Sequence, residues 1–174
     1  MSSEVMMIPK SRVGAVIGKN GETRELIEHE TKSKIKIDSE SGEVRVMNQD
    51  AGAAHATEQV IKAIGRGFNP EIALKLMNQD YYLEILELRE IVGKNSNVQK
   101  SKKGRVIGRD GVMRKKIEEL TGCFVSVFGK TIALIGKQED LFKAVNTVEL
   151  LLKGSEHKTA MKYLVDEPGE EFNL

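Results

Sequence analysis

The sequence predicts an α+β protein that contains two copies of one folding unit. The hexapeptide VIGKNG at residues 16–21 returns as VIGRDG at residues 106–111, and sliding the chain by 90 residues aligns further identical residues on both sides of it. These pairs are Ser11 and Ser101, Gly14 and Gly104, Ile17 and Ile107, Arg24 and Arg114, Ile27 and Ile117, Glu28 and Glu118, and Thr31 and Thr121. A match of this length indicates that a whole folding unit is duplicated.

Hydrophobic periodicity predicts the same order of elements in each copy: strand, helix, helix, strand, strand, helix. In the first copy the strands are expected at 4–8, IKI (35–37) and VRVM (44–47), and the helices at 11–17, 22–31 and 50–64. In the second copy the strands are expected at 81–88, FVSVF (124–128) and TIALI (131–135), and the helices at 101–107, 112–121 and 138–152. The last helix of each copy is amphipathic and should cover the sheet.

These elements divide the chain of 174 residues into two domains. The first is expected at 1–68 and the second at 81–160. Between them, 69–80 is expected to be a short helical linker, because Pro70 suits the first turn of a helix. No Gly/Ser-rich stretch occurs there, which favours a fixed relation between the domains. The last segment, 161–174, is acidic and is expected to be a flexible tail.

Basic residues gather around both copies of the hexapeptide, although the formal net charge of the chain is only +1. From Lys94 to Lys116 there are nine basic residues and one acidic residue, a net charge of +8, and from Lys10 to Arg24 the net charge is +3. A charge run is often just a solvated surface. Its recurrence at the same position of a repeat favours a polyanionic partner.

The paired glycines of the hexapeptide suit a phosphate. A helix N-terminus presents backbone N–H groups and a partial positive charge, and glycines at both ends of a four-residue turn let a sugar-phosphate chain approach closely. Both copies have this arrangement in a strand–helix–turn–helix context, with Lys19 or Arg109 as a cation at the tip.

This doubled pattern resembles the KH module in its type I order of elements, over about residues 4–65 and 81–153. The resemblance implies a fold of two tandem type I KH modules, each β-α-α-β-β-α with a three-stranded antiparallel sheet packed by helices. KH modules clamp about four nucleotides of single-stranded RNA, with the GxxG loop on the backbone. The RNA-binding residues implied in the first module are Arg12, Gly14, Gly18, Lys19, Asn20, Gly21, Arg24 and Ile35. Those in the second are Lys102, Lys103, Gly104, Arg105, Gly108, Arg109, Asp110, Gly111, Arg114 and Lys115. Ile27 and Ile117 are expected in the core.

Arg24 and Arg114 depart from many KH modules, which have an apolar residue there. A basic residue at this position, together with GSEHKTAMKYLV after the second module, is similar to the two-module KH proteins of the Dim and Krr type, in their archaeal form. That resemblance implies a role in ribosome assembly and rRNA processing near the 3′ end of the small-subunit rRNA. It also implies possible contact with a translation initiation factor alpha subunit or other assembly proteins.

Asp110, which replaces Asn20 in the second loop, can be interpreted in two ways. A carboxylate about 4 to 6 Å from a phosphate is repelled by something like 1 kcal/mol when solvated, so the second loop is by this effect the poorer RNA binder. The same carboxylate can serve as a charge or cap at the start of a helix.

Other functional classes fit the sequence less well. GAVIGKN has one residue too few between its glycines for a P-loop, and the three histidines lie far apart, so neither catalysis, a metal nor a cofactor is expected. Adjacent Glu118 and Glu119 are interpreted as solvated charge, and Cys123 as a buried thiol. With no long apolar run, the protein is expected to be cytoplasmic, without a membrane partner. The alternative function is a protein-interaction scaffold in which one KH fold binds a protein instead of RNA.

Overall fold

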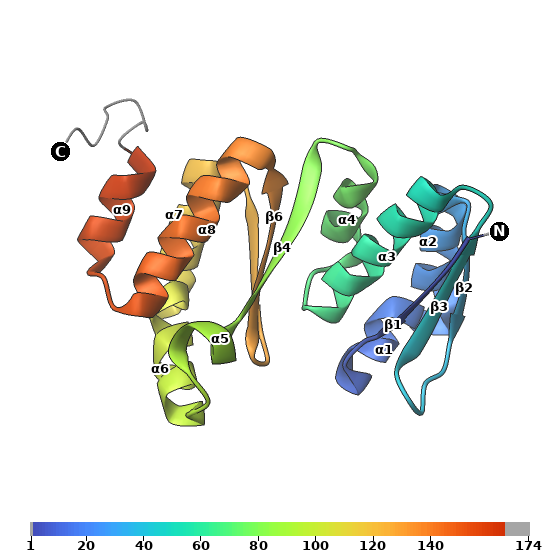
Figure 1. Cartoon of the computed structure of the whole chain (residues 1–174), viewed down its shortest axis with the longest axis horizontal. Coiled ribbons are helices and arrows are strands. Elements are labelled where there is room, and N and C mark those ends of the chain that lie inside the picture. The colour runs from blue at the N-terminus through green and yellow to red at the C-terminus, as the bar shows by residue number, and fades with distance from the viewer. Residues whose placement is uncertain (1, 166–174) are drawn as a thin grey trace. The chain divides into compact units, whose positions relative to one another are not determined.

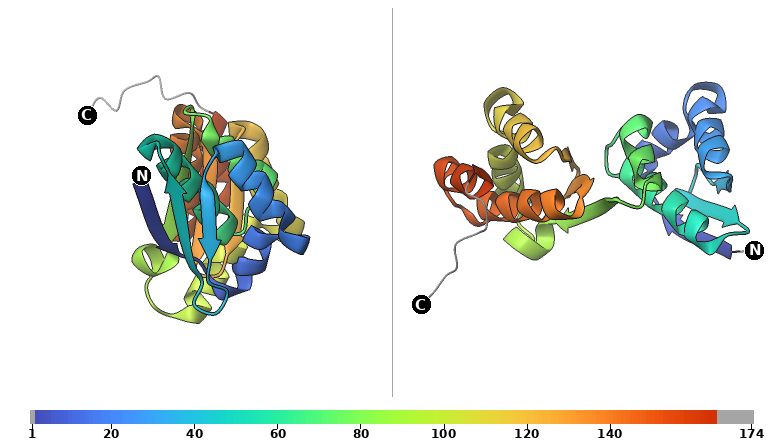
Figure 2. Two further views of the ribbon diagram at one scale, coloured as in Figure 1. Left: turned by 90° about the vertical axis from the view of Figure 1, so that its right-hand side faces the viewer. Right: turned by 90° about the horizontal axis from the view of Figure 1, so that it is seen from above.

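A computed structural model describes residues 2–165, which form two compact units that divide the chain between Leu83 and Glu84. Each unit has a three-stranded sheet with helices packed on one face (Figures 1 and 2). The strand orders are β1-β3-β2 and β4-β6-β5, so the third strand of each unit lies in the middle of its sheet.

The first unit follows the expected order of elements. It comprises β1 (Ser2–Met7), α1 (Lys10–Ile17), the 3-10 turn η1 (Lys19–Gly21), α2 (Glu22–Thr31), β2 (Lys34–Ile37), β3 (Glu43–Asn48), α3 (Ala51–Gly65), α4 (Pro70–Ala73) and the 3-10 turn η2 (Leu74–Met77). Both pairs of strands are antiparallel, with Val5 opposite Arg45 and Ile35 opposite Val46. Ile27, Val44 and Ile61 are fully buried between the helices and the sheet, as hydrophobic patterning requires.

The second unit repeats this plan and adds helical residues before the loop. It comprises β4 (Tyr81–Glu87), α5 (Leu88–Val92), α6 (Ser96–Ile107), the 3-10 turn η3 (Arg109–Gly111), α7 (Val112–Thr121), β5 (Phe124–Phe128), β6 (Thr131–Lys137), α8 (Gln138–Lys153) and α9 (His157–Val165). The sequence prediction missed α5, which is only five residues long, and the first five residues of α6, which are too polar to show a helical apolar stripe. Asn95 starts α6 by accepting hydrogen bonds from the backbone N–H groups of Asn97 and Val98.

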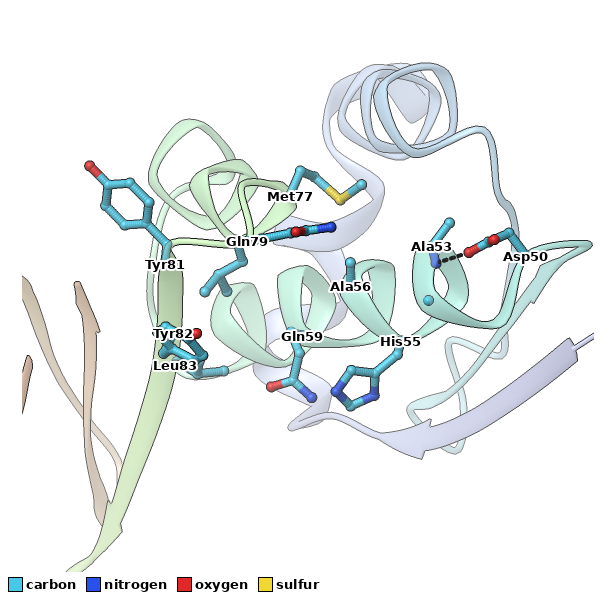
Figure 3. A pocket seen from close by; sticks show the side chains of 12 residues that line it. Asp50, Ala53, His55, Ala56, Gln59, Met77, Gln79, Tyr81, Tyr82 and Leu83 are labelled. Carbon is cyan, nitrogen blue, oxygen red and sulfur yellow. Dashed lines mark hydrogen bonds between the residues drawn. The ribbon is translucent and has the colours of Figure 1, made fainter. Parts of the chain in front are cut away.

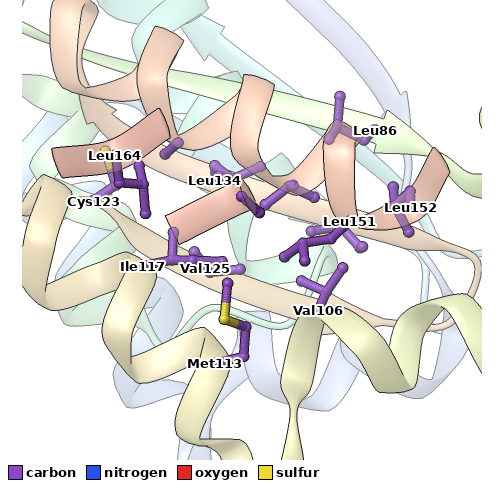
Figure 4. Close-up of a cluster of buried hydrophobic side chains, with 14 of the residues drawn as sticks. Leu86, Val106, Met113, Ile117, Cys123, Val125, Leu134, Leu151, Leu152 and Leu164 are labelled. Atoms are coloured by element: carbon purple, nitrogen blue, oxygen red, sulfur yellow. The ribbon is translucent and has the colours of Figure 1, made fainter. Parts of the chain in front are cut away.

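The core of the second unit joins side chains from all of its layers (Figure 4). Ile117 from α7, Leu134 from β6 and Leu151 from α8 are fully buried in it. Cys123 lies in the same cluster, and burial raises the pKa of its thiol. The prediction of a buried thiol is therefore confirmed.

Each unit ends in an additional helical segment after its last long helix. In the first unit α4 and η2 pack on α3, so the segment expected to be a linker belongs to the first compact unit. In the second unit α9 packs on α7 and α8 and runs to Val165, so residues 161–165, expected in a flexible tail, are helical. The rest of that expected tail lies outside the described residues.

The two end segments are themselves a repeat, offset by 87 residues rather than 90. Gly67 and Gly154 both have φ above +100°, and in each case the following residue donates its N–H to a carbonyl five residues back, Phe68 to Ala63 and Ser155 to Leu150. Further on, Ala73 matches Ala160, and both are fully buried. The duplicated unit therefore has seven main elements rather than six.

Candidate nucleic-acid interface

The two GxxG loops have nearly the same backbone conformation. The first glycines, Gly18 and Gly108, both have φ of 74°, with ψ of 174° and 175°. The last glycines, Gly21 and Gly111, are left-handed and precede α2 and α7 directly, and no side chain caps either helix. Each loop thus presents a glycine-flanked turn at the start of a helix, which is the geometry that suits a phosphate group.

The first glycine of each loop is required by the protein itself. A Cβ at Gly18 would lie 2.7 Å from the backbone nitrogen of Thr23, and a Cβ at Gly108 would lie 2.8 Å from that of Met113. The last glycines need their positive φ but have room around them, and nothing lies within 4 Å of a Cβ built at Gly111. The outer side of the turn is therefore open.

Asn20 and Asp110 occupy the same left-handed position, with φ of 55° and 54°. Apart from glycine, asparagine and aspartate adopt this conformation most readily, so the backbone explains why the two loops exchange one for the other. The cap of α7 is Gly111, and no side-chain hydrogen bond is made there. Of the two interpretations of Asp110, the one in which its side chain caps α7 is therefore wrong.

Gly14 and Gly104 lie inside α1 and α6, four residues before the loops. Among residues 2–165, no atom from another part of the chain lies within 4 Å of a Cβ built at either position. Glycine inside a helix is less favourable than alanine by about 1 kcal/mol. Internal packing does not explain why glycine occurs at these two positions. Both glycines leave the helix backbone open to close approach.

Arg24 and Arg114 take up the same position in the two units. Within the described residues, the Nε atoms of these arginines are the buried side-chain polar atoms that have no hydrogen-bond partner. Arg24 Nε lies 4.0 Å from a carboxylate oxygen of Glu28, while the side chain remains 42% exposed. Each arginine therefore has donor capacity that the protein does not use.

Glu28 and Glu118, one turn further along, fasten the next strand to the helix. Glu28 accepts a hydrogen bond from the N–H of Ile35 (2.7 Å), and Glu118 accepts one from the N–H of Val125 (2.9 Å). The interpretation of Glu118 as solvated charge is wrong, because its carboxylate has a structural role.

Arg12 and Arg105 are used inside the protein. Arg12 donates to the carbonyls of Ile64 (2.8 Å) and Phe68 (3.1 Å) at the end of α3. Arg105 donates to the carbonyls of Leu151 (3.0 Å) and Ser155 at the end of α8, which are the equivalent positions. Burial lowers the pKa of Arg12. We leave both arginines out of the candidate interface because their guanidinium groups already hold the end of a helix.

The other predicted cations of the second unit differ in their surroundings. Lys102 reaches toward Gly154 at the end of α8. Lys103 donates to the carbonyl of Gly129 (2.8 Å) but remains accessible, and Lys115 is exposed on α7. Lys103 and Lys115 stay in the candidate interface with Lys19, Arg24, Arg109 and Arg114.

Of the apolar residues near the loops, Ile35 is only 4% exposed and packs in the core, so its side chain is not available to a base. The prediction that Ile27 and Ile117 lie in the core is confirmed, since both are fully buried. Ile17 and Ile107, at the ends of α1 and α6, are half-buried next to the loops.

A hollow of about 560 Å³ in the first unit lies away from its GxxG loop, over α3, η2 and the start of β4 (Figure 3). Its polar lining includes Asp50, whose carboxylate accepts from the N–H of Ala53, together with His55 and Gln59. No lysine or arginine lines it, so it does not suit phosphate. Among the described residues no helix is long and apolar enough to cross a membrane, and no group of three His, Cys, Asp or Glu could hold a metal ion.

The fold and the doubled loop define a protein with two type I KH domains in tandem. Residues 82–167 match the family described as the eukaryotic-type KH domain (KH-domain type I), and residues 3–75 match the KH domain family. A KH domain-containing protein of Methanocaldococcus jannaschii is 41% identical over 94% of this chain and 73% of its own length.

Solved structures agree with these matches. The crystal structure of Dim2p from Pyrococcus horikoshii has a TM-score of 0.89 and 41% identity, over 95% of this chain and 99% of that one. The Dim2p chain in an a/eIF2alpha–aDim2p–rRNA complex from the same organism has a TM-score of 0.88 and 42% identity, over 94% of this chain and 92% of that one. The pre-rRNA-processing protein pno1 of Aspergillus oryzae is 28% identical over 75% of this chain, which spans 52% of that protein. The chain belongs to the Dim2/Pno1 family of tandem KH proteins.

Proposed function

We propose that this protein binds single-stranded RNA through both KH domains and acts in rRNA processing, without catalysis of its own. The observation that carries the proposal is the pair of GxxG turns with matching dihedral angles, each at the uncapped start of a helix and each followed by an arginine whose Nε has no hydrogen-bond partner. A phosphate accepts hydrogen bonds from such backbone N–H groups and from a guanidinium group.

The finer part of the proposal concerns the RNA and its partner. We infer that the RNA is small-subunit rRNA near its 3′ end, and that a translation initiation factor alpha subunit contacts the protein. Support comes from the solved relative that forms a complex with a/eIF2alpha and rRNA, and from the fungal pre-rRNA-processing relatives. Crosslinking the protein to RNA in its native cells and sequencing that RNA tests the assignment. Reads spread evenly over unrelated transcripts would contradict it.

The RNA-binding proposal is tested by reversing the charge in each loop. At 0.1 M salt we expect Lys19→Asp with Asn20→Asp to weaken the binding of short single-stranded RNA by the first domain, and Arg109→Asp to weaken its binding by the second, in each case about fivefold or more, the effect of losing one phosphate contact. Asp110 shows that aspartate is compatible with the left-handed loop position. Because phosphate contacts carry no sequence information, the loss should be similar for all sequences.

The matched control is Lys137→Asp, which makes the same charge change as Arg109→Asp at the exposed last residue of β6. Its affinity should stay close to that of the unchanged protein. If no loop variant binds RNA more weakly than this control, the alternative is favoured, in which a KH fold serves as a protein-interaction surface.

A further inference from the structure

A hollow lies directly beside the second GxxG loop, between that loop, α7 and α9. Its volume is about 640 Å³, which falls within the usual range for small-molecule sites. The residues that line it are Gly108, Arg109, Asp110, Val112, Met113, Lys116, His157, Lys158 and Met161. Since Gly108 to Asp110 belong to the loop, the loop itself forms one wall of this hollow.

The lining combines apolar surface with cations. Val112, on the first turn of α7, is 49% exposed, and Met113 and Met161 extend the apolar part. The charged groups are Arg109, Lys116 and Lys158 against the single carboxylate of Asp110, a net charge of +2. His157 is held in place by a hydrogen bond from its Nε2 to the carbonyl of Arg105 (2.9 Å). Apolar surface suits the face of a nucleobase, and the cations suit its phosphate.

The first unit contains the equivalent hollow with the opposite charge. It is lined by Glu22, Thr23, Leu26, Asn69, Pro70 and Glu71, and its volume is about 390 Å³. Leu26 stands where the second unit has Lys116, and Glu71 stands where it has Lys158. Its two carboxylates have no cation beside them in the lining, so a phosphate would be repelled there. The same architecture is thus acidic in one domain and basic in the other.

We propose that the basic hollow holds a nucleotide of the bound RNA strand that lies outside the four in the KH groove. The base lies over Val112 and Met161, and the phosphates contact Lys116 and Lys158. The second domain therefore binds a longer stretch of RNA than the first. This inference rests on the proposed RNA-binding function.

The test replaces the cations of the hollow by the residues of the first domain, in the variant Lys116→Leu with Lys158→Glu. The full chain also carries Lys19→Asp with Asn20→Asp, so that binding depends on the second domain. Two randomised single-stranded RNAs are compared by fluorescence anisotropy, one of about four nucleotides and one of about ten, because a KH groove holds about four.

The longer RNA should bind about 25-fold more weakly at 0.1 M salt, about fivefold for each of two lost phosphate contacts, and its slope of log K against log salt should fall by about 1.4. The short RNA should be nearly unaffected. The control Lys94→Leu with Lys137→Glu changes the net charge by the same amount at exposed residues outside the hollow and should affect both RNAs little. The reverse exchange, Leu26→Lys with Glu71→Lys in a chain with both loops intact, should strengthen binding of the longer RNA.

The outcomes separate this inference from the function on which it rests. If Arg109→Asp weakens the binding of both RNAs while the exchange at Lys116 and Lys158 weakens the binding of neither, the RNA-binding function stands. The hollow then has another ligand, such as an acidic protein segment. If the exchange weakens both RNAs equally, Lys116 and Lys158 act through the groove and the inference is wrong. If Arg109→Asp weakens neither RNA, the proposed function itself fails.

Discussion

Gly14 and Gly104 show at the residue scale how an unfavourable choice points to a ligand. Both lie inside helices, and no described residue from another part of the chain lies within 4 Å of a Cβ built at either position. The resemblance to KH modules implied that both are site residues. That they face open space required the structure, because spacing in the sequence does not say which side of a helix is covered.

Replacing Gly104 by leucine should separate stability from binding. We expect Gly104→Leu to stabilise the second domain by about 0.5–1 kcal/mol, since glycine is a poor helix former, and to weaken RNA binding, since the side chain would fill the space that a strand needs. Thermal unfolding and an RNA titration measure the two effects. Asn97→Leu, at an exposed position two turns earlier on α6, is the control and should leave binding unchanged. Unchanged RNA affinity in Gly104→Leu would show that no ligand approaches this helix.

Glu118 illustrates a role that sequence reasoning could not find. Its neighbour Glu119 is also acidic, and only the contact of Glu118 with the N–H of Val125 distinguishes them. We expect Glu118→Ala to lower the free energy of unfolding by about 1–3 kcal/mol, because it leaves that N–H of a buried residue without its acceptor. Glu119→Ala, at an exposed position, should change it by less than about 0.5 kcal/mol. Urea denaturation measures both, and equal effects would contradict the structural role.

At the scale of the element, the second helix of each unit was the easiest to predict because a glycine marks its start. Both α2 and α7 have the bounds expected from the sequence, because a glycine precedes each start and a left-handed residue follows each end. Helix α6 was predicted five residues too short, since its first turns are held by the Asn95 cap rather than by an apolar stripe. The repeat of the two end segments was missed because they are offset by 87 residues, while the rest of the two copies aligns at an offset of 90 residues.

Helix α9 should contribute to the stability of the second domain. Leu164 is 9% exposed and belongs to the buried cluster of that domain, so Leu164→Ala should lower the free energy of unfolding by about 2 kcal/mol. Val165, the next residue, is 66% exposed, and Val165→Ala should have little effect. Denaturation curves that are the same for the two variants would mean that α9 does not pack in solution.

At the scale of the whole molecule, a net charge of +1 conceals two domains whose charges are arranged differently. The sequence located the basic surroundings of both loops, because the charges are consecutive along the chain. It could not show that Arg12 and Arg105 are used at helix ends, or that Lys116 and Lys158, 42 positions apart, line one hollow. The candidate site therefore loses Arg12 and Arg105, which the sequence had predicted as RNA-binding residues. It gains Lys116 and Lys158, which the sequence had not.

The proposed binding of RNA by both KH domains predicts that the affinity depends on the length of the RNA. An RNA of about four nucleotides fills only one groove. When one loop is disabled, the other domain can still bind this RNA. The observed affinity should therefore fall by no more than the contribution of the lost domain. A strand long enough to reach both domains binds the second one at a raised effective concentration, which can increase the overall affinity by about 10² to 10⁴.

We therefore expect Arg109→Asp to weaken binding of an RNA of about 30 nucleotides by a much larger factor than binding of the tetranucleotide. Titrations of both RNAs against the unchanged protein, each single-loop variant and the variant with both loops changed provide the measurement. Equal factors for the two RNAs would mean that the domains bind separate strands, because a shared strand links the two binding events while separate strands leave them independent.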